Sequence, residues 1–131
     1  MIRTISLLVM ASLLLASLAG AAEKKSDTTA ADNAIIADCQ TTAAVGVELL
    51  KMKGKKSPEE MLTAARKMLT DRKYQGSFGD LEFAANMYTS MTLQPNAEMD
   101  RFVAHASPEL LAEMQEQNEI ACINNAFGAR Q

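Results

Sequence analysis

The two cysteines, Cys39 and Cys122, are the residues of this chain whose chemistry is easiest to foresee. An even number of cysteines in a small secreted chain is typical of disulfide bonding. Because the N-terminal segment predicts export, we expect an intramolecular Cys39–Cys122 bond. The alternatives are a pair of buried free thiols and a bridge between two chains.

Candidates for catalysis or metal binding are sparse. His105 is the only histidine, no Gly-x-Ser-x-Gly elbow accompanies it, and a zinc site would need the cysteines that are expected to pair. Methionine sulfur prefers Cu(I), and Met87 and Met91 share a helix face, while Met61 and Met68 are seven residues apart. Copper sites usually bring the sulfurs closer and add histidine, so we expect these methionines to fill the core. The sequence thus predicts no catalytic residue, no metal, no cofactor and no enzyme.

A stripe of acidic residues is the strongest candidate for a binding surface. Glu109, Glu113 and Glu116 are spaced by four and three residues, which places them on one face of a helix, and Glu119 extends the stripe. They fall on the face away from Leu111, so a solvated surface is the simpler interpretation and recognition of a partner is the alternative.

The lysine run from Lys51 to Lys56 has four lysines in the six positions around Gly54. Such a run could bind anionic lipid or an acidic partner. The simpler interpretation is that the lysines complement the negative end of the helix dipole and lie in a solvated loop. The segment 76–79, Gly-Ser-Phe-Gly, lacks the Lys-Ser/Thr and the preceding strand of a phosphate-binding loop. We interpret it as a helix stop joined to a helix start.

The first residues resemble the three parts of a secretory signal peptide. Arg3 is the only charge in residues 1–22, an uncharged apolar run covers residues 5–18, and small residues follow at positions 19–22. The apolar run is shorter than the ~20 residues needed to cross a bilayer, and Ala21 stands where a lipoprotein would need cysteine. We therefore expect cleavage after Ala21 or Ala22, a soluble periplasmic product and no stable membrane insertion.

The composition of the remaining chain is that of one small helical domain. Asp and Glu number 16 against 13 Lys and Arg in the whole chain, which argues against a nucleic-acid surface because such surfaces need a basic stripe. Ala, Met and Leu dominate the apolar residues, and these are helix formers. Residues 23–29 are polar without periodicity and predict a disordered leader.

Capping signals and apolar spacings of three and four residues predict five helical segments. Thr29, Ser57, Ser77 and Ser107 are the expected starts of four of them, and Pro95-Asn96 separates a short helix between the third and the last. Lys53, Gly76 and Gly128 mark expected ends. Short connections imply a compact antiparallel bundle of four to five helices over residues 30–128, all-α in class.

By elimination, this pattern favours a protein-binding module of inhibitor, immunity-factor or envelope-chaperone type, with an envelope or secreted protein as its partner. The alternative is a periplasmic carrier of a metal or cofactor.

Overall fold

The computed structural model describes residues 30–128. The first helix covers residues 30–52, and it is followed by α2 (Pro58–Asp71), α3 (Leu81–Leu93), α4 (Ala97–His105) and α5 (Pro108–Gly128). These residues contain no β-strand, so the all-helical prediction is confirmed for them. The expected signal peptide (1–22) and the expected polar leader (23–29) both lie outside the described residues.

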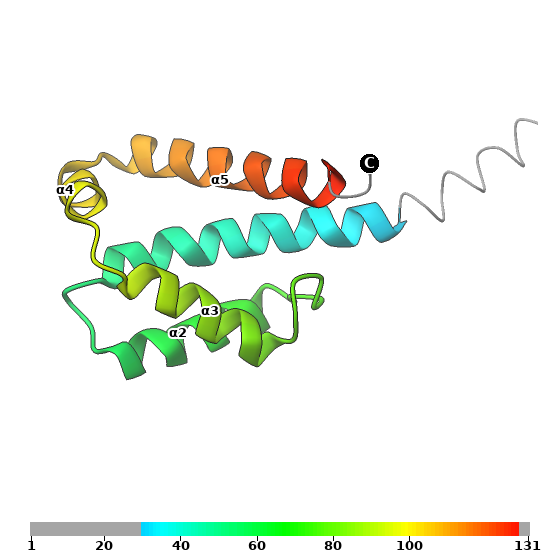
Figure 1. Ribbon diagram of the computed structural model, residues 1–131, viewed down its shortest axis with the longest axis horizontal. Coiled ribbons are helices and arrows are strands. Elements are labelled where there is room, and N and C mark those ends of the chain that lie inside the picture. Colours follow the sequence, from blue (N-terminus) through cyan, green and yellow to red (C-terminus); the bar gives the residue numbers. More distant parts are fainter. Residues whose placement is uncertain (1–29, 129–131) are drawn as a thin grey trace, which may run out of the picture. The chain divides into compact units, whose positions relative to one another are not determined.

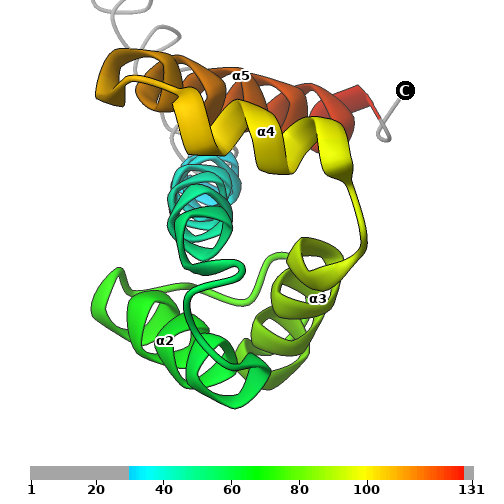
Figure 2. The ribbon, with the colours of Figure 1, turned by 90° about the vertical axis from the view of Figure 1, so that its left-hand side faces the viewer.

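The first helix is the centre of the compact unit Ala34–Gln131. It lies between α5 on one side and the α2–α3 pair on the other (Figure 1, Figure 2). Residues 41–45 are buried one after another, and five consecutive residues pass through more than one full turn. At that level the helix therefore has buried residues around its whole circumference. The short α4 lies across the end of the long helices, so it departs from the expected antiparallel arrangement.

The apolar core is built by only three of the helices. Its fully buried members come from the first helix, α2 and α3: Val45, Leu49, Met61, Ala65, Leu69, Ala84 and Ala85. By contrast, α4 and α5 contain no fully buried residue. Because burial of apolar surface is the main stabilising term, the first three helices carry most of it and the last two are attached to their surface.

Side chains at the helix starts account for most of the helix bounds. Ser57 and Ser107 accept hydrogen bonds from the amides of Glu60 and Leu110 at 3.1 and 3.2 Å, as expected, and Asn96 accepts one from Met99 at 3.0 Å. None of the helices among residues 30–128 is both long enough and apolar enough to cross a bilayer.

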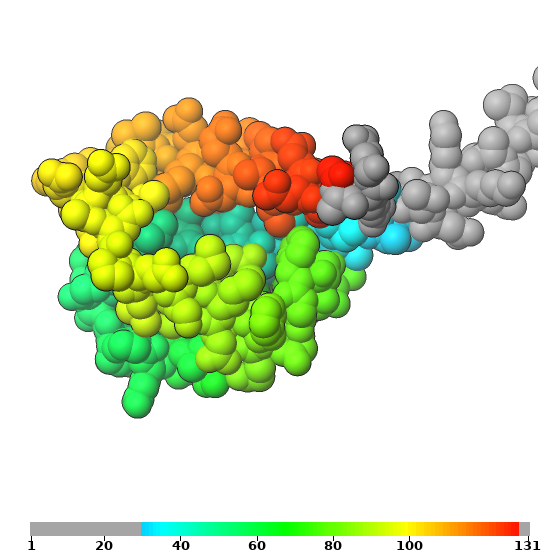
Figure 3. Space-filling view, in the orientation of Figure 1, coloured from blue at the N-terminus to red at the C-terminus, as the bar shows by residue number. Residues whose placement is uncertain are grey.

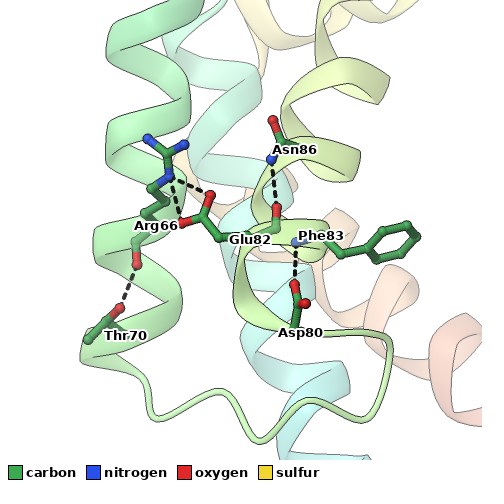
Figure 4. Close-up of polar contacts among 6 residues, drawn as sticks. All are labelled: Arg66, Thr70, Asp80, Glu82, Phe83 and Asn86. Carbon is green, nitrogen blue, oxygen red and sulfur yellow. Dashed lines mark hydrogen bonds and ion pairs between the residues drawn. The ribbon is translucent and has the colours of Figure 1, made fainter.

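The predicted cap of α3 was wrong by three residues. Asp80, not Ser77, is the N-cap, and its carboxylate accepts a hydrogen bond from the amide of Phe83 at 2.7 Å (Figure 4). The Ser-x-x-Asp spacing fits a capping box, but Gly79 has a φ of +99°, which is incompatible with a helix. The helix can therefore begin only after Gly79.

An ion pair joins α2 to the start of α3. The Nε atom of Arg66 lies 2.9 and 3.0 Å from the two carboxylate oxygens of Glu82, while the ring of Phe83 points away from both helices (Figure 4). The pair is solvent-exposed, so its contribution to stability is small. It links two helices that the core already holds together.

Candidate functional site: a groove between α3 and α5

Three of the four residues of the predicted acidic stripe lie on the surface, as expected for its simpler interpretation, but Glu119 does not continue their face. Glu109, Glu113 and Glu116 are exposed, whereas Glu119 is half-buried. With 100° per residue, Glu116 and Asn118 lie about 200° apart around α5. None of the four glutamates lines the two pockets that flank Tyr88, Asn118 and Cys122.

The lysine run does not form one solvated patch. Lys51 pairs with Glu48 at 2.9 Å and Lys56 with Glu60 at 3.9 Å. The ammonium of Lys53 instead donates to the carbonyl oxygen of Gln94 at 2.7 Å and lies 3.1 Å from the carboxylate of Asp100. Its side chain is only 17% exposed. Lys53 therefore ties the end of the first helix to the α3–α4 connection.

The expected disulfide is present between Cys39 and Cys122, whose Cα atoms are 5.6 Å apart. His105 is exposed on α4, and residues 30–128 contain no cluster of three or more His, Cys, Asp or Glu side chains that would hold a metal ion. The chain thus brings no set of acidic, cysteine or histidine ligands together in the part that the structure describes.

The methionines divide into two groups, which corrects the expectation that all of them fill the core. Met61 is fully buried and Met68 packs against the core. Met87 is half-buried and Met91 is 59% exposed. The helix-face argument placed Met87 and Met91 correctly on one side of α3, but that side faces a groove instead of the core.

This groove runs between α3 and α5, with the first helix as its floor, and Figure 3 shows it as a hollow. It consists of two pockets of ≈ 370 and ≈ 480 Å³. Both are lined by Tyr88 of α3 and by Asn118 and Cys122 of α5. Since the pockets share these three residues, we treat them as one continuous groove.

Small residues make the floor of the groove possible. Ala43 and Gly46 of the first helix line the half next to α4, and nothing lies within 4 Å of where a Cβ of Gly46 would be. The Cys39–Cys122 bond joins a fully buried residue of the first helix to a residue of α5 that lines the groove. The disulfide therefore fixes the wall formed by α5 at a set distance from the first helix.

Residues of two connecting loops line the two ends of the groove. Lys53 and Gln94, joined by their hydrogen bond, line one end, together with Pro95, Asn96 and Met99. Phe78, from the α2–α3 loop, lines the other end. The position of each end therefore depends on how its connecting loop is held.

A buried carboxylate holds the α2–α3 loop. Asp38 is 1% exposed, and its two oxygens accept hydrogen bonds from the amides of Gln75 at 2.8 Å and Ser77 at 2.9 Å. A buried charge is stable only when it is hydrogen-bonded, and these two amides meet that need. Asp38 thus anchors the loop that carries Phe78 on the first helix.

Within the same loop, the hydroxyl of Tyr74 donates to the carbonyl oxygen of Gly79 at 2.8 Å and accepts from the amide of Phe78 at 3.1 Å. Burial raises the pKa of Tyr74 above its usual value, and the charge of Asp38 acts in the same direction. The hydroxyl therefore keeps its proton, and with it the bond to Gly79, throughout the neutral range.

The sequence did not identify the groove. Its residues come from the first helix, α3, α4 and α5, and their proximity depends on tertiary packing. The one available signal was the presence of Met87 and Met91 on a helix whose core face is already formed by other residues. Comparison of the chain with protein-family models, with curated proteins and with solved structures gives no match.

Proposed function

We propose that this chain is an exported protein-binding module, of inhibitor, immunity-factor or envelope-chaperone type, and that the α3–α5 groove receives its partner. The observation that supports the proposal is an open, mostly apolar groove whose wall carries Met87 and Met91. Methionine side chains are flexible and polarizable, and they are over-used at binding surfaces that must adapt to a partner. An exposed apolar surface of this kind marks interaction sites.

The proposed compartment is the periplasm, with another envelope or secreted protein as the partner. The Cys39–Cys122 bond is compatible with an oxidising compartment. The predicted signal peptide points to the same route.

Site-specific photo-crosslinking tests the proposal. A benzophenone amino acid replaces Met91 in the groove, and in a matched control it replaces Glu116 on the opposite side of α5. After irradiation in the native envelope, we expect the Met91 position to capture a protein that mass spectrometry identifies. Capture only from the Glu116 position would show that the partner binds the acidic stripe instead of the groove. Capture from neither position would contradict the proposal.

The acidic stripe is a second surface that the same partner could contact at the rim. If it does, Glu113→Lys with Glu116→Lys leaves folding intact, slows association and weakens its salt dependence, because rim charges act mainly on the association rate. The comparison variant is Lys51→Glu with Lys55→Glu, and Lys53 is left unchanged because it holds the α3–α4 connection. If the Glu113→Lys and Glu116→Lys variant associates as before while the Lys51→Glu and Lys55→Glu variant no longer binds, the lysines and not the glutamates recognise the partner.

A carrier of a small apolar cofactor is the second candidate, and one observation favours it. The half of the groove next to α4 has a volume of ≈ 370 Å³, which lies within the usual range for small-molecule sites. Native mass spectrometry of protein purified from its own envelope separates the two functions. A small molecule that is released on denaturation would support the carrier, and a mass equal to the polypeptide alone would oppose it.

A further inference from the structure

The groove contains polar side chains that have no partner within the described part of the chain. Thr42 and Thr92 donate to carbonyl oxygens of their own helices, and Lys53 is bonded to Gln94 and Asp100. The hydroxyl of Tyr88 and the side-chain amides of Asn118 and Asn125 make no hydrogen bond to described residues. These three groups are therefore available to a ligand.

Their positions place them opposite one another across the groove. Tyr88 belongs to α3 and Asn118 to α5, and both line the two pockets. Asn125 follows Asn118 by seven residues, which is two turns of the helix, and it lines the half next to Phe78. The groove thus has an apolar floor and walls, with neutral hydrogen-bonding groups along both sides.

The charge of the lining restricts the ligand further. Lys53 is the only charged side chain that lines either pocket, and its ammonium is already paired. A charged ligand would lose its hydration without gaining an opposite charge. The groove therefore suits an uncharged segment.

We infer, on the basis of the proposed function, that the groove binds an extended and uncharged apolar segment of the partner protein through the partner's backbone. Any ligand that covers the groove removes water from Tyr88, Asn118 and Asn125. An extended backbone has free N–H and C=O groups to replace that water. The backbone groups of a helical segment are bonded within the helix, and a small apolar molecule has none. Neither can satisfy these side chains through a backbone, and side chains left without partners weaken binding.

The dimensions agree with this ligand. From Asn118 to Ala126 the wall formed by α5 rises by about 12 Å at 1.5 Å per residue. An extended peptide covers that length with about four residues at ~3.3 Å each. Alternate side chains of such a segment would enter the apolar floor.

A fluorescent six-residue peptide, acetyl-Gly-Leu-Ser-Leu-Gly-Leu-amide labelled through an added terminal linker, tests the inference by fluorescence anisotropy. Two further probes are its derivative with alternate backbone nitrogens methylated, and a hydrocarbon-stapled helical peptide with leucines on one face. We expect the parent peptide to bind, methylation to weaken its binding about tenfold or more, and the stapled helix to bind less tightly than the parent.

Variants separate loss of hydrogen bonds from steric effects of the methyl groups. The double variant Tyr88→Phe with Asn118→Leu is expected to bind the parent peptide less tightly. Methylation of the peptide should then reduce its affinity much less than it does for the unmodified protein, because a double-mutant cycle detects groups that interact directly. Asn124→Leu is the matched control, because Asn124 is an exposed amide of α5 outside the groove, and it should leave binding unchanged.

Tighter binding of the stapled helix, or full sensitivity to methylation in the double variant, would overturn the inference. If no peptide binds while crosslinking at Met91 still captures a protein, the extended-segment inference fails and the proposed function stands. If neither peptide binding nor crosslinking is seen, both fail.

Discussion

At the scale of single residues, the buried polar side chains of Asp38 and Thr89 differ in whether they are hydrogen-bonded. Asp38 is fully hydrogen-bonded and joins the first helix to the α2–α3 loop. The hydroxyl of Thr89 has no hydrogen-bond partner among the described residues, although it is buried in α3. The first arrangement stabilises the fold, whereas the second costs part of that stability.

Replacing Asp38 with alanine should lower the free energy of unfolding by about 3 kcal/mol, because two loop amides lose a charged acceptor inside the protein. Urea unfolding at neutral pH measures the change. Asp38→Asn keeps one acceptor and should cost roughly half as much. Asp71→Ala, which removes only the exposed pair with Lys67, is the control and should cost less than about 1 kcal/mol. Equal effects of Asp38→Ala and Asp71→Ala would contradict the anchoring role.

Thr89→Val should stabilise the protein, by about 1 kcal/mol, since valine has the same shape and removes a buried hydroxyl without a partner. The matched control is Thr92→Val, which removes a hydroxyl that donates to Tyr88 at 2.8 Å. That change should be neutral or destabilising. A lower melting temperature for Thr89→Val would indicate that its hydroxyl is engaged, for example with a buried water.

At the scale of helices, the chain divides into a core of three helices and a surface pair, α4 and α5. Besides the backbone of the α3–α4 connection, the Cys39–Cys122 bond is a covalent cross-link between the two parts. The half-buried residues of α5, such as Leu111 and Met114, supplement this link with apolar contact. The wall of the groove is thus attached less firmly than its floor.

Replacing both Cys39 and Cys122 with alanine should therefore loosen α5 selectively. The bond closes a loop over a sequence separation of 83, for which the chain-entropy model gives at most about 4–5 kcal/mol. We expect a markedly lower melting temperature, and faster amide hydrogen exchange in α5 than in α2 and α3. Uniform exchange across all helices would show that the domain opens as one unit.

At the scale of the whole molecule, the question is whether the folded unit is the form that leaves the cytoplasm. The sequence predicts that residues 1–22 are removed on export. Export also decides whether Cys39 and Cys122 meet oxidising conditions while the chain folds.

The intact mass of the exported protein should correspond to a chain that begins at Ala22 or Glu23. Expression with and without residues 1–22, followed by fractionation, provides the comparison, and only the longer form should yield the disulfide-bonded product in the periplasmic fraction. A full-length product retained in the membrane would contradict both the signal peptide and the proposed compartment.

Local signals in the sequence determined the helices of this protein. Ser57 and Ser107 begin helices because their hydroxyls accept amides only three residues away, and the apolar spacing identified buried Met61, Ala65 and Leu69. Such contacts lie within one or two turns of a helix, so the order of residues is enough to predict them. The Cys39–Cys122 pairing was also foreseeable, because two cysteines allow one intramolecular bond.

The groove was decided by the tertiary structure alone. Met91 and Asn118 look like ordinary helix residues, and their shared groove exists because α5 packs on the first helix without closing against α3. Lys53 appeared to be part of a solvated run, yet it reaches Gln94, 41 residues further along the chain. Asp38 likewise finds its partners 37 and 39 residues away. These contacts depend on which helix faces meet and how closely they approach, and that is set by the packing of side chains distant in sequence.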